Sequence, residues 1–185
     1  MVRLEEIYPA WFLEQFGQYK EAVSNIELDS LTSAISVDKI IKTVGLSLKN
    51  TLLETHSGQV DSGDKVIFVN SREPLVRQRF TKAHELGHYV LGHEGVSNRL
   101  VDTSDYTFFD RLKERAANSF AAELLMPKKL IKNVIDKYLK ETGMTSEELK
   151  YSSINDFVSY LSETLEVSKE SMEYRLLNLG IIKDV

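Results

Sequence analysis

The spacing of apolar residues along the chain predicts a mainly helical protein with one small strand region. Residues 4–24 carry apolar side chains at intervals of about three and four positions, which is the period of one helical face, so we expect a single helix facing the core. The members of this stripe are Ile7, Trp11, Phe12, Phe16, Tyr19 and Val23. Residues 32–48 repeat the pattern, with Ser36 or Ser33 as a capping residue. Further helices are expected from Leu75 to a break at Gly92, over 111–126 as far as Pro127, and near 128–141, 146–165 and 168–179.

The period changes between residues 51 and 70. The segments TLLETHSGQV (51–60) and KVIFVN (65–70) gather β-branched and aromatic residues on both sides of the polar turn DSGD, which predicts a β-hairpin. The second strand fits two positions: an edge of the sheet, where an extended substrate segment could add as another strand, or a buried strand of the core. Residues 96–109 show no clear period and are expected to be irregular, with Asp110 capping the helix that follows.

Composition limits the size and the chemistry of the protein. A chain of 185 residues with 42% hydrophobic and 28% charged residues can form one compact domain with a small appendage. We expect a core at 1–143, including the N-terminal helix, and a helical subdomain at 144–185 packed on it. The net charge of −5 disfavours binding of nucleic acid over the whole surface. Cysteine is absent, which excludes disulfides, thiolate zinc ligands and cysteine nucleophiles.

The N-terminal segment lacks the basic start and the uninterrupted apolar stretch of a signal peptide. No uncharged apolar run approaches the roughly 18 to 20 residues that span a bilayer. We therefore expect a cytoplasmic protein with no membrane partner.

Three of the four histidines lie between residues 84 and 93, and two of them form the pattern H-E-x-x-H with Glu85. On a helix, positions i and i+4 are about 40° apart after one full turn, so His84 and His88 project from one face and can share a metal ion. Glu85 is offset from His84 by about 100°, where its carboxylate can take a proton from water without being a ligand. These residue types suit a zinc hydrolase; the alternative is a pair of surface histidines beside an unrelated glutamate.

A third ligand is needed, and the sequence offers His93, Glu94 and the more distant Glu114. On a continuing helix His93 would point away from His84, so we expect a capping or surface residue there. Glu114 shares a small, apolar helical stripe with Asn118, where a carboxylate is costly unless it is paired or metal-bound. The alternative for Glu114 is an ion pair with a neighbouring arginine, either Arg111 or Arg115.

Two strings in this order, RQRFTKAHELGHYVLGH and ERAANSFAAELLMP, resemble the ImmA/IrrE family of zinc-dependent endopeptidases. The later string VSKESMEYRLLNLGI also resembles the end of that family's domain, so the similarity spans residues 35–182. The resemblance implies an α+β, mainly helical, zincin-like metallopeptidase core with a small sheet, an active-site helix and helix-turn-helix-like C-terminal helices. It implies His84, His88 and Glu114 as metal ligands and Glu85 as general base, and it suggests that Asn118 orients a ligand.

The same resemblance implies the function. It points to one zinc ion, although the ligand set tolerates other divalent ions such as manganese or iron. The implied substrate is a partner protein, typically a helix-turn-helix transcriptional repressor encoded nearby on a phage or other mobile element; related proteins form toxin-antitoxin pairs with such partners. Tyr89, Tyr106 and His56 are candidate donors to the oxyanion, and the sequence does not rank them.

Two other functions compete with proteolysis. Residues 161–176 fit the rhythm of a DNA-binding helix-turn-helix, but Glu166 occupies the turn position that suits glycine, and residues 144–185 hold four basic against eight acidic residues. We therefore expect no direct contact with nucleic acid. The second is a non-proteolytic binding module that keeps its metal for stability or sensing; a closed structural site would have to recruit His93 or Glu94 as a fourth ligand.

Overall fold

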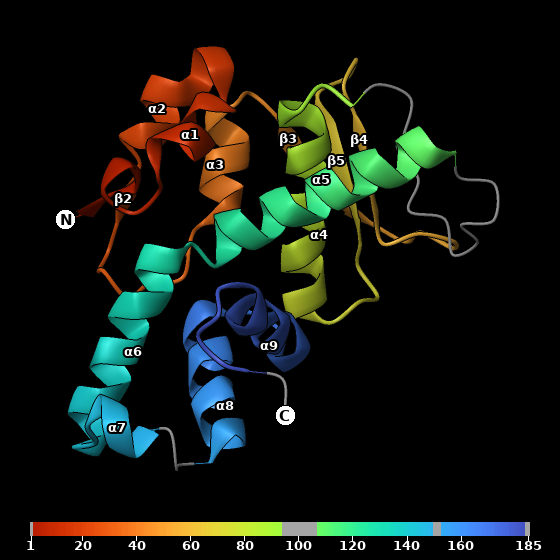
Figure 1. Cartoon of the computed structure of the whole chain (residues 1–185). Coiled ribbons are helices and arrows are strands. Elements are labelled where there is room, and N and C mark those ends of the chain that lie inside the picture. The colour runs from red at the N-terminus through yellow and green to blue at the C-terminus, as the bar shows by residue number, and fades with distance from the viewer. Residues whose placement is uncertain (1, 94–106, 150–152, 184–185) are drawn as a thin grey trace.

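The computed structural model describes residues 2–93, 107–149 and 153–183. Figure 1 shows α4 beside the sheet and α5 crossing α4. In this view the N-terminal helices α1–α3 lie above, and the C-terminal helices α8 and α9 lie below. The elements in chain order are β1 Val2–Arg3, the 3-10 helix η1 Leu4–Glu6, α1 Ala10–Glu14, the 3-10 helix η2 Gly17–Tyr19, α2 Lys20–Ser24, β2 Glu27–Leu28, α3 Val37–Thr43, β3 Ser47–Thr51, β4 Gly58–Asp61, β5 Val66–Asn70, α4 Leu75–Val90, α5 Phe108–Leu125, α6 Lys128–Thr142, α7 Ser146–Leu149, α8 Ile154–Leu165 and α9 Lys169–Asn178.

The larger sheet has the strand order β3–β5–β4, with β3 parallel and β4 antiparallel to β5. The expected hairpin is confirmed, since Gly58 of β4 pairs with Val69 of β5 and Asp61 pairs with Val66. β5 is the central strand, because it pairs on both sides, and its Ile67 and Val69 are fully buried. The edge position considered for residues 65–70 is therefore wrong, and the core position is the one observed.

The N-terminal segment is not the single helix expected at residues 4–24. Pro9 stands at the N-cap of α1, where its missing N–H is harmless. Gly17, the first residue of η2, adopts a φ of +53°, which prevents α1 and α2 from forming one continuous helix. The apolar stripe nevertheless contributes to the core through residues such as the fully buried Phe12. Trp11 departs from the expectation, because 58% of its surface is exposed. The periodicity thus identified most of the buried positions but not the breaks between the helical pieces.

The helix expected at residues 32–48 is shorter in the structure. Ser36 is the N-cap of α3 as predicted, but α3 ends at Thr43, and Gly45 follows with a φ of +79°. Leu48 belongs instead to β3, where it pairs with Ile67 of β5. The sequence pattern had placed the start of β3 in a helix, but pairing with β5, a segment further along the chain, makes it a strand.

α5 begins with a capping box rather than with the predicted cap. Thr107 is the N-cap: its side-chain oxygen accepts from the N–H of Asp110, and the Asp110 carboxylate accepts from the N–H of Thr107 at 3.0 Å. Asp110 is thus the third residue of the helix, and the prediction that it is the cap was wrong. Of the stretch 96–109 expected to be irregular, residues 96–106 lie outside the described residues and Phe108 already opens α5.

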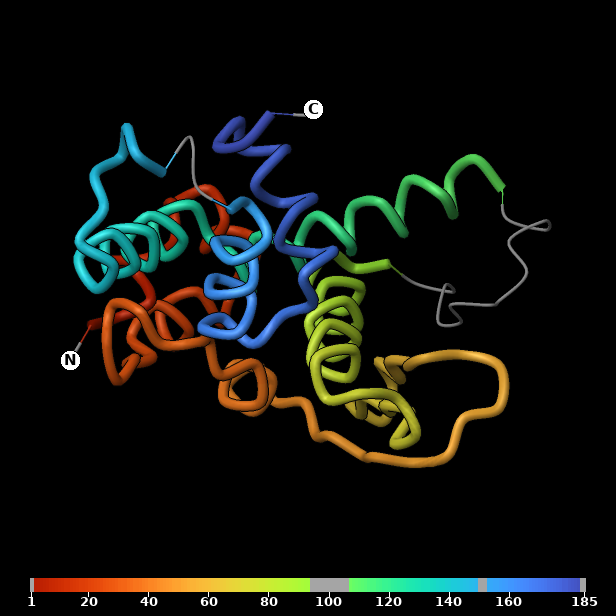
Figure 2. Tube along the Cα trace, turned by 90° about the horizontal axis from the view of Figure 1, so that it is seen from below, coloured from red at the N-terminus to blue at the C-terminus, as the bar shows by residue number. Residues whose placement is uncertain are grey.

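The C-terminal helices lie between α6 and α4, as Figure 2 shows from a second direction. Gly143, with a φ of +70°, follows α6, and Ser153 caps α8 in an extended conformation, so 146–165 is not the one continuous helix expected. α8 ends at Leu165 and α9 begins at Lys169, so only three residues join them; the helix-turn-helix-like arrangement of these helices stays a prediction. The Nε of Arg175 on α9 donates to the carbonyl oxygen of Met126 at 2.9 Å, which ties this group to the end of α5. The division of the chain at residue 143 stays a prediction.

Within the described ranges, no helix combines the length and the apolar character needed to cross a membrane.

Candidate metal centre

The second half of α4 carries the H-E-x-x-H residues in a buried environment. Pro74 precedes the helix as N-cap, and every residue from Ala83 to His88 is buried. Only 1% of the surface of His84 and 2% of that of His88 is exposed. Imidazoles buried this deeply need polar partners, because an unpaired ring nitrogen in the core costs free energy. The alternative of two surface histidines is therefore excluded.

α5 supplies the main partner, Glu114. Its carboxylate spans both rings: Oε2 lies 3.3 Å from Nε2 of His84, and Oε1 lies 3.1 Å from Nε2 of His88. Arg111 and Arg115, the alternative partners considered from the sequence, are exposed. The carboxylate on the small, apolar stripe of α5 thus faces the histidines of α4.

The spacing of these atoms fits a single metal ion. The two Nε2 atoms of His84 and His88 are 3.0 Å apart, and one ligand atom from each of the three residues lies within 4.8 Å of the others. Ligands placed tetrahedrally about 2.0–2.1 Å from a zinc ion would be separated by roughly 3.3 Å. The 3.0 Å between the two Nε2 atoms is close to that value, as are the 3.3 Å from His84 to Oε2 of Glu114 and the 3.1 Å from His88 to Oε1. Two imidazoles and one carboxylate supply three protein ligands and leave room for water or substrate.

The electrostatics of the cluster keep Glu114 ionised. Burial raises the pKa of its carboxyl, but hydrogen bonds from His84 and His88 and their charge together lower it by more, so that the pKa falls to about 2. Glu114 is therefore a carboxylate at neutral pH, which is the form that can hold a divalent ion.

Asn118 lies one turn further along α5 and fixes the other side of His84. Its Oδ1 is 3.0 Å from Nδ1 of His84. An amide oxygen only accepts, so Nδ1 of His84 carries a proton, and its Nε2, on the side of Glu114, is the nitrogen that a metal ion would bind. This is the geometry expected for a residue that orients a metal ligand.

Glu85 is buried, with 2% of its surface exposed, and it is not one of the three clustered residues. It faces the strand β4, because a Cβ atom added to Gly58 would lie 3.3 Å from Cγ of Glu85. Its neighbour in the sequence, His84, belongs to the cluster. The second position of the H-E-x-x-H pattern is the one from which a carboxylate is expected to exchange a proton with water.

Comparison with known families decides the classification. The family model of the IrrE N-terminal-like domain matches residues 39–177, which is most of the chain. The chain belongs to this metallopeptidase family. The resemblance to ImmA/IrrE proteins drawn from the two sequence motifs is thereby confirmed, as is the α+β, mainly helical fold. Together with the cluster of His84, His88 and Glu114, membership in the family implies a metal ion.

Relatives in the IrrE/ImmA family share about a third of the aligned residues. The chain is 31% identical to the radiation response metalloprotease IrrE of Deinococcus radiodurans over 133 residues, which cover 71% of this chain and 37% of that protein. It is 33% identical to IrrE of Deinococcus deserti over 106 residues, or 57% of this chain and 37% of the relative. It is 31% identical to the metallopeptidase ImmA of Bacillus subtilis over 114 residues, which cover 60% of this chain and 64% of ImmA. The matched region thus spans little more than a third of either IrrE protein.

A solved structure of a Mycobacterium tuberculosis transcriptional regulator shares the fold of this family member. The two align with a TM-score of 0.53 and 16% sequence identity, over 95% of this chain and 52% of the other. At this identity the likeness concerns the fold alone.

His93 is not part of the three-residue cluster, but it contacts one of its members. Gly92 follows α4 with a φ of +65°, and the N–H of His93 donates to the carbonyl oxygen of His88 at 3.0 Å, which confirms the expected helix break and capping role. The side chain also returns over the helix end, with Nδ1 3.1 Å from Nδ1 of His88. Burial lowers the pKa of His93, and the charge of His88 lowers it further. The sequence signal for this contact was the glycine before His93, since a C-terminal glycine turns the chain back on the helix.

Of the three candidate oxyanion donors, Tyr89 and His56 are among the described residues. Tyr106 and the alternative ligand Glu94 lie outside the described residues. Burial raises the pKa of Tyr89, as does its hydrogen bond with Tyr19. His56 accepts from or donates to Thr55 through Nδ1 at 3.0 Å.

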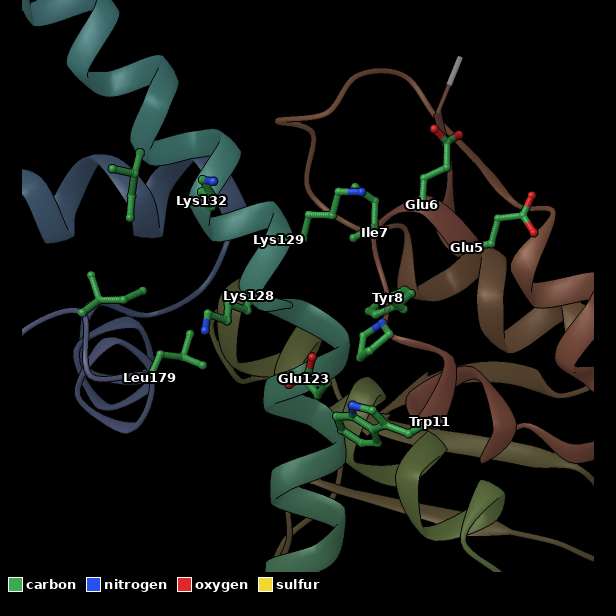
Figure 3. A pocket seen from close by; sticks show the side chains of 13 residues that line it. Glu5, Glu6, Ile7, Tyr8, Trp11, Glu123, Lys128, Lys129, Lys132 and Leu179 are labelled. Carbon is green, nitrogen blue, oxygen red and sulfur yellow. The ribbon is translucent and has the colours of Figure 1, made fainter. Parts of the chain in front are cut away.

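A pocket of about 850 Å³ lies at the other end of α5 and is separate from the histidine cluster. Figure 3 shows lysines of α6 and Trp11 of α1 on its walls. Glu123 lines it, whereas His84, His88 and Glu114 do not. The pocket therefore lies apart from the candidate metal centre.

Proposed function

We propose that this protein is a zinc-dependent endopeptidase whose site consists of His84, His88, Glu114 and Glu85. The observation that carries the proposal is the meeting of ligand atoms from α4 and α5 at separations suited to one ion. Family membership supplies the reaction class, since the relatives are a metalloprotease and a metallopeptidase.

His84 and His88 would hold the ion through Nε2, and Glu114 would hold it through its carboxylate. When bound, the zinc ion supplies Lewis-acid activation of a water molecule and of the scissile carbonyl group. By accepting from Nδ1–H of His84, Asn118 would keep that proton on Nδ1, so that Nε2 can bind the ion. Zinc fits the donor set of two imidazoles and one carboxylate, and the same set tolerates other divalent ions such as manganese or iron.

Glu85 acts as the general base and then as the general acid. It takes the proton of the attacking water and delivers it to the leaving amine, so that a single carboxylate serves both halves of the hydrolysis. Support comes from its position next to His84 in the H-E-x-x-H pattern and from its burial at 2% exposure.

The substrate is a partner protein, which we propose to be a helix-turn-helix transcriptional repressor encoded nearby on a phage or other mobile element. This rests on the resemblance to ImmA/IrrE proteins and on nothing in the geometry of the site. A cytoplasmic location is part of the same proposal.

Direct reading of DNA by α8 and α9 has less support. Glu170 and Glu173 are exposed on α9, which would be the reading helix, and these carboxylates would repel phosphates. The function that competes with proteolysis is that of a non-proteolytic, metal-containing binding module. Such a module would bind its partner protein without cleaving it.

The test is to incubate the purified, zinc-loaded protein with the product of the neighbouring gene and to follow its cleavage by mass spectrometry. We expect discrete fragments with the wild type, none with Glu85→Gln, which retains zinc, and none with His84→Ala, which loses zinc. Full cleavage by Glu85→Gln would overturn the assigned base. Binding of the partner by a zinc-loaded wild type that leaves it intact would favour the non-proteolytic module.

A further inference from the structure

The turn after α4 places His93 where the helix itself could not. On a continuing helix, His93 would lie about 140° around the axis from His88. Instead Leu91 ends the helix, Gly92 takes a φ of +65°, and the N–H of Gly92 donates to the carbonyl oxygen of Tyr89 at 3.2 Å. The N–H of His93 then donates to the carbonyl oxygen of His88 at 3.0 Å. These paired hydrogen bonds form a Schellman motif, which fixes the backbone of His93 above the last turn of α4.

The fixed backbone brings one ring nitrogen of His93 to the back of His88. Nδ1 of His93 is 3.1 Å from Nδ1 of His88, on the opposite side of the His88 ring from Glu114. Two ring nitrogens at this distance form a hydrogen bond only if one carries a proton and the other does not.

The other nitrogen of His88 decides which one carries the proton. Nε2 of His88 faces Nε2 of His84 at 3.0 Å and Oε1 of Glu114 at 3.1 Å, so it is the atom directed at the metal centre. A metal-binding nitrogen must be unprotonated, which leaves the proton of neutral His88 on Nδ1. His88 is then the donor and His93 the acceptor.

We propose that His93 is a positioning residue for the metal site: by accepting from Nδ1–H of His88, it holds that ring with Nε2 directed at the ion. The inference rests on the proposed metal centre. His93 does for His88 what Asn118 does for His84, whose Nδ1 lies 3.0 Å from the amide oxygen. Each histidine ligand thus has its own acceptor, one from α5 and one from the turn that ends α4.

This role predicts a specific effect on metal affinity. Without an acceptor for its Nδ1–H, the His88 ring loses its preferred orientation and tautomer. Removing a hydrogen-bond partner of a metal ligand typically lowers metal affinity by about 10- to 100-fold. The fold should be little changed, because the hydrogen bonds of the Schellman motif are donated by the backbone N–H groups of Gly92 and His93 and not by the side chain of His93.

The test compares His93→Leu, which removes the acceptor, with His93→Asn, whose amide oxygen can occupy the place of Nδ1. Zinc affinity is measured by competition with a chelating dye, and thermal unfolding of the metal-free proteins serves as the folding control. We expect about 10- to 100-fold weaker zinc binding by His93→Leu, recovery of most of that loss in His93→Asn, and similar unfolding temperatures for all. His93→Ala replaces His93→Leu if the latter fails to fold.

A spectroscopic measurement distinguishes the positioning role of His93 from a purely structural one, because a structural role would not change the exchange rate of the His88 Nδ1 proton. In zinc-loaded protein with ¹⁵N-labelled histidine, the Nδ1 proton of His88 should exchange slowly in the wild type and in His93→Asn, and rapidly in His93→Leu. Equal zinc affinity of wild type and His93→Leu, or equal weakening by both variants, would overturn the positioning role. A wild type that binds no zinc, with His84→Ala indistinguishable from it, would instead overturn the proposed function.

Discussion

Gly87 of α4 lies directly against the ring of Phe120 on α5. A Cβ atom at Gly87 would be 3.0 Å from Cδ1 of Phe120 and 3.3 Å from the carbonyl oxygen of Ala117. These contacts are tighter than a side chain normally makes, so the glycine within H-E-L-G-H sets how closely the two helices approach. Because Glu114 is on α5 and the histidines are on α4, this approach also sets the distance between the ligands.

We therefore expect Gly87→Ala to weaken metal binding although alanine is the better helix former. The gain in helix propensity is about 1 kcal/mol. Pushing the methyl group against Phe120 costs about 1–3 kcal/mol, so we expect a net loss of roughly 1 kcal/mol in the free energy of unfolding. Zinc affinity, measured by dye competition, should fall because Glu114 moves away with α5.

The double variant Gly87→Ala with Phe120→Leu is the matched control. If contact with the ring causes the effect, the two substitutions will not be additive, and the double variant will bind zinc better than Gly87→Ala alone. Additive losses, or a Gly87→Ala protein that is more stable and binds zinc like the wild type, would show that this contact does not limit the helix spacing.

A second close contact joins β4 to the same helix. A Cβ atom at Gly58 would lie 2.3 Å from Cγ2 of Thr81 and 3.0 Å from the carbonyl oxygen of Phe68. Gly58→Ala must therefore displace β4 from α4, and we expect it to lower the free energy of unfolding by about 2–3 kcal/mol, as measured by urea denaturation. Thr81→Ser removes the methyl group that is met first, so Gly58→Ala should cost clearly less in that background. Equal costs in both backgrounds would contradict this account.

The candidate site was predictable because each half of it is local. His84, Glu85 and His88 lie within two turns of one helix, and the position of Glu114 on an apolar stripe follows from the helical period alone. The sequence did not show that the histidine face of α4 and the Glu114 face of α5 meet, because that contact depends on packing between the two helices. His93 could not be assigned by the same rule, since its position follows from the turn at Gly92 rather than from the helix.

The errors in the fold have a common physical origin. In β3, Leu48 pairs with Ile67 of β5. The sequence of β3, SLKNT, has too weak a strand preference to show that the helical pattern before it has ended. At the N-terminus, the apolar spacing continued across Pro9 and Gly17, and both residues broke the helix. Periodicity reports which side chains are buried, whereas pairing partners and chain breaks depend on tertiary context.

Glu166 occupies a left-handed conformation at the turn between α8 and α9, with φ 54° and ψ 48°. This conformation costs a residue with a side chain about 1–2 kcal/mol relative to glycine. The compensating ion pair with Arg79 on α4, at 3.7 Å, involves a Glu166 side chain that is 64% exposed and is therefore worth at most about 1 kcal/mol. We expect Glu166→Gly to be as stable as the wild type or slightly more so.

Glu166→Ala is the control for this prediction, because it removes the same ion pair and keeps the strain. Urea unfolding should rank the glycine variant above the alanine variant by about 1 kcal/mol. Should the two variants unfold at the same urea concentration, backbone strain at this turn would not be the deciding effect.

Acid should weaken the metal-free protein through Glu114. Its pKa is lowered from 4.5 to about 2, so folding favours the ionised form; the resulting stabilisation is fully present above about pH 4.5 and is lost as the pH falls toward 2. In Glu114→Gln this contribution is absent, although the amide keeps the size of the side chain. Urea midpoints of the two metal-free proteins should therefore differ most near pH 5, with the wild type more stable, and converge toward pH 2. Curves that stay parallel over this interval would mean that Glu114 does not interact with His84 and His88 in the folded protein as the structure places it.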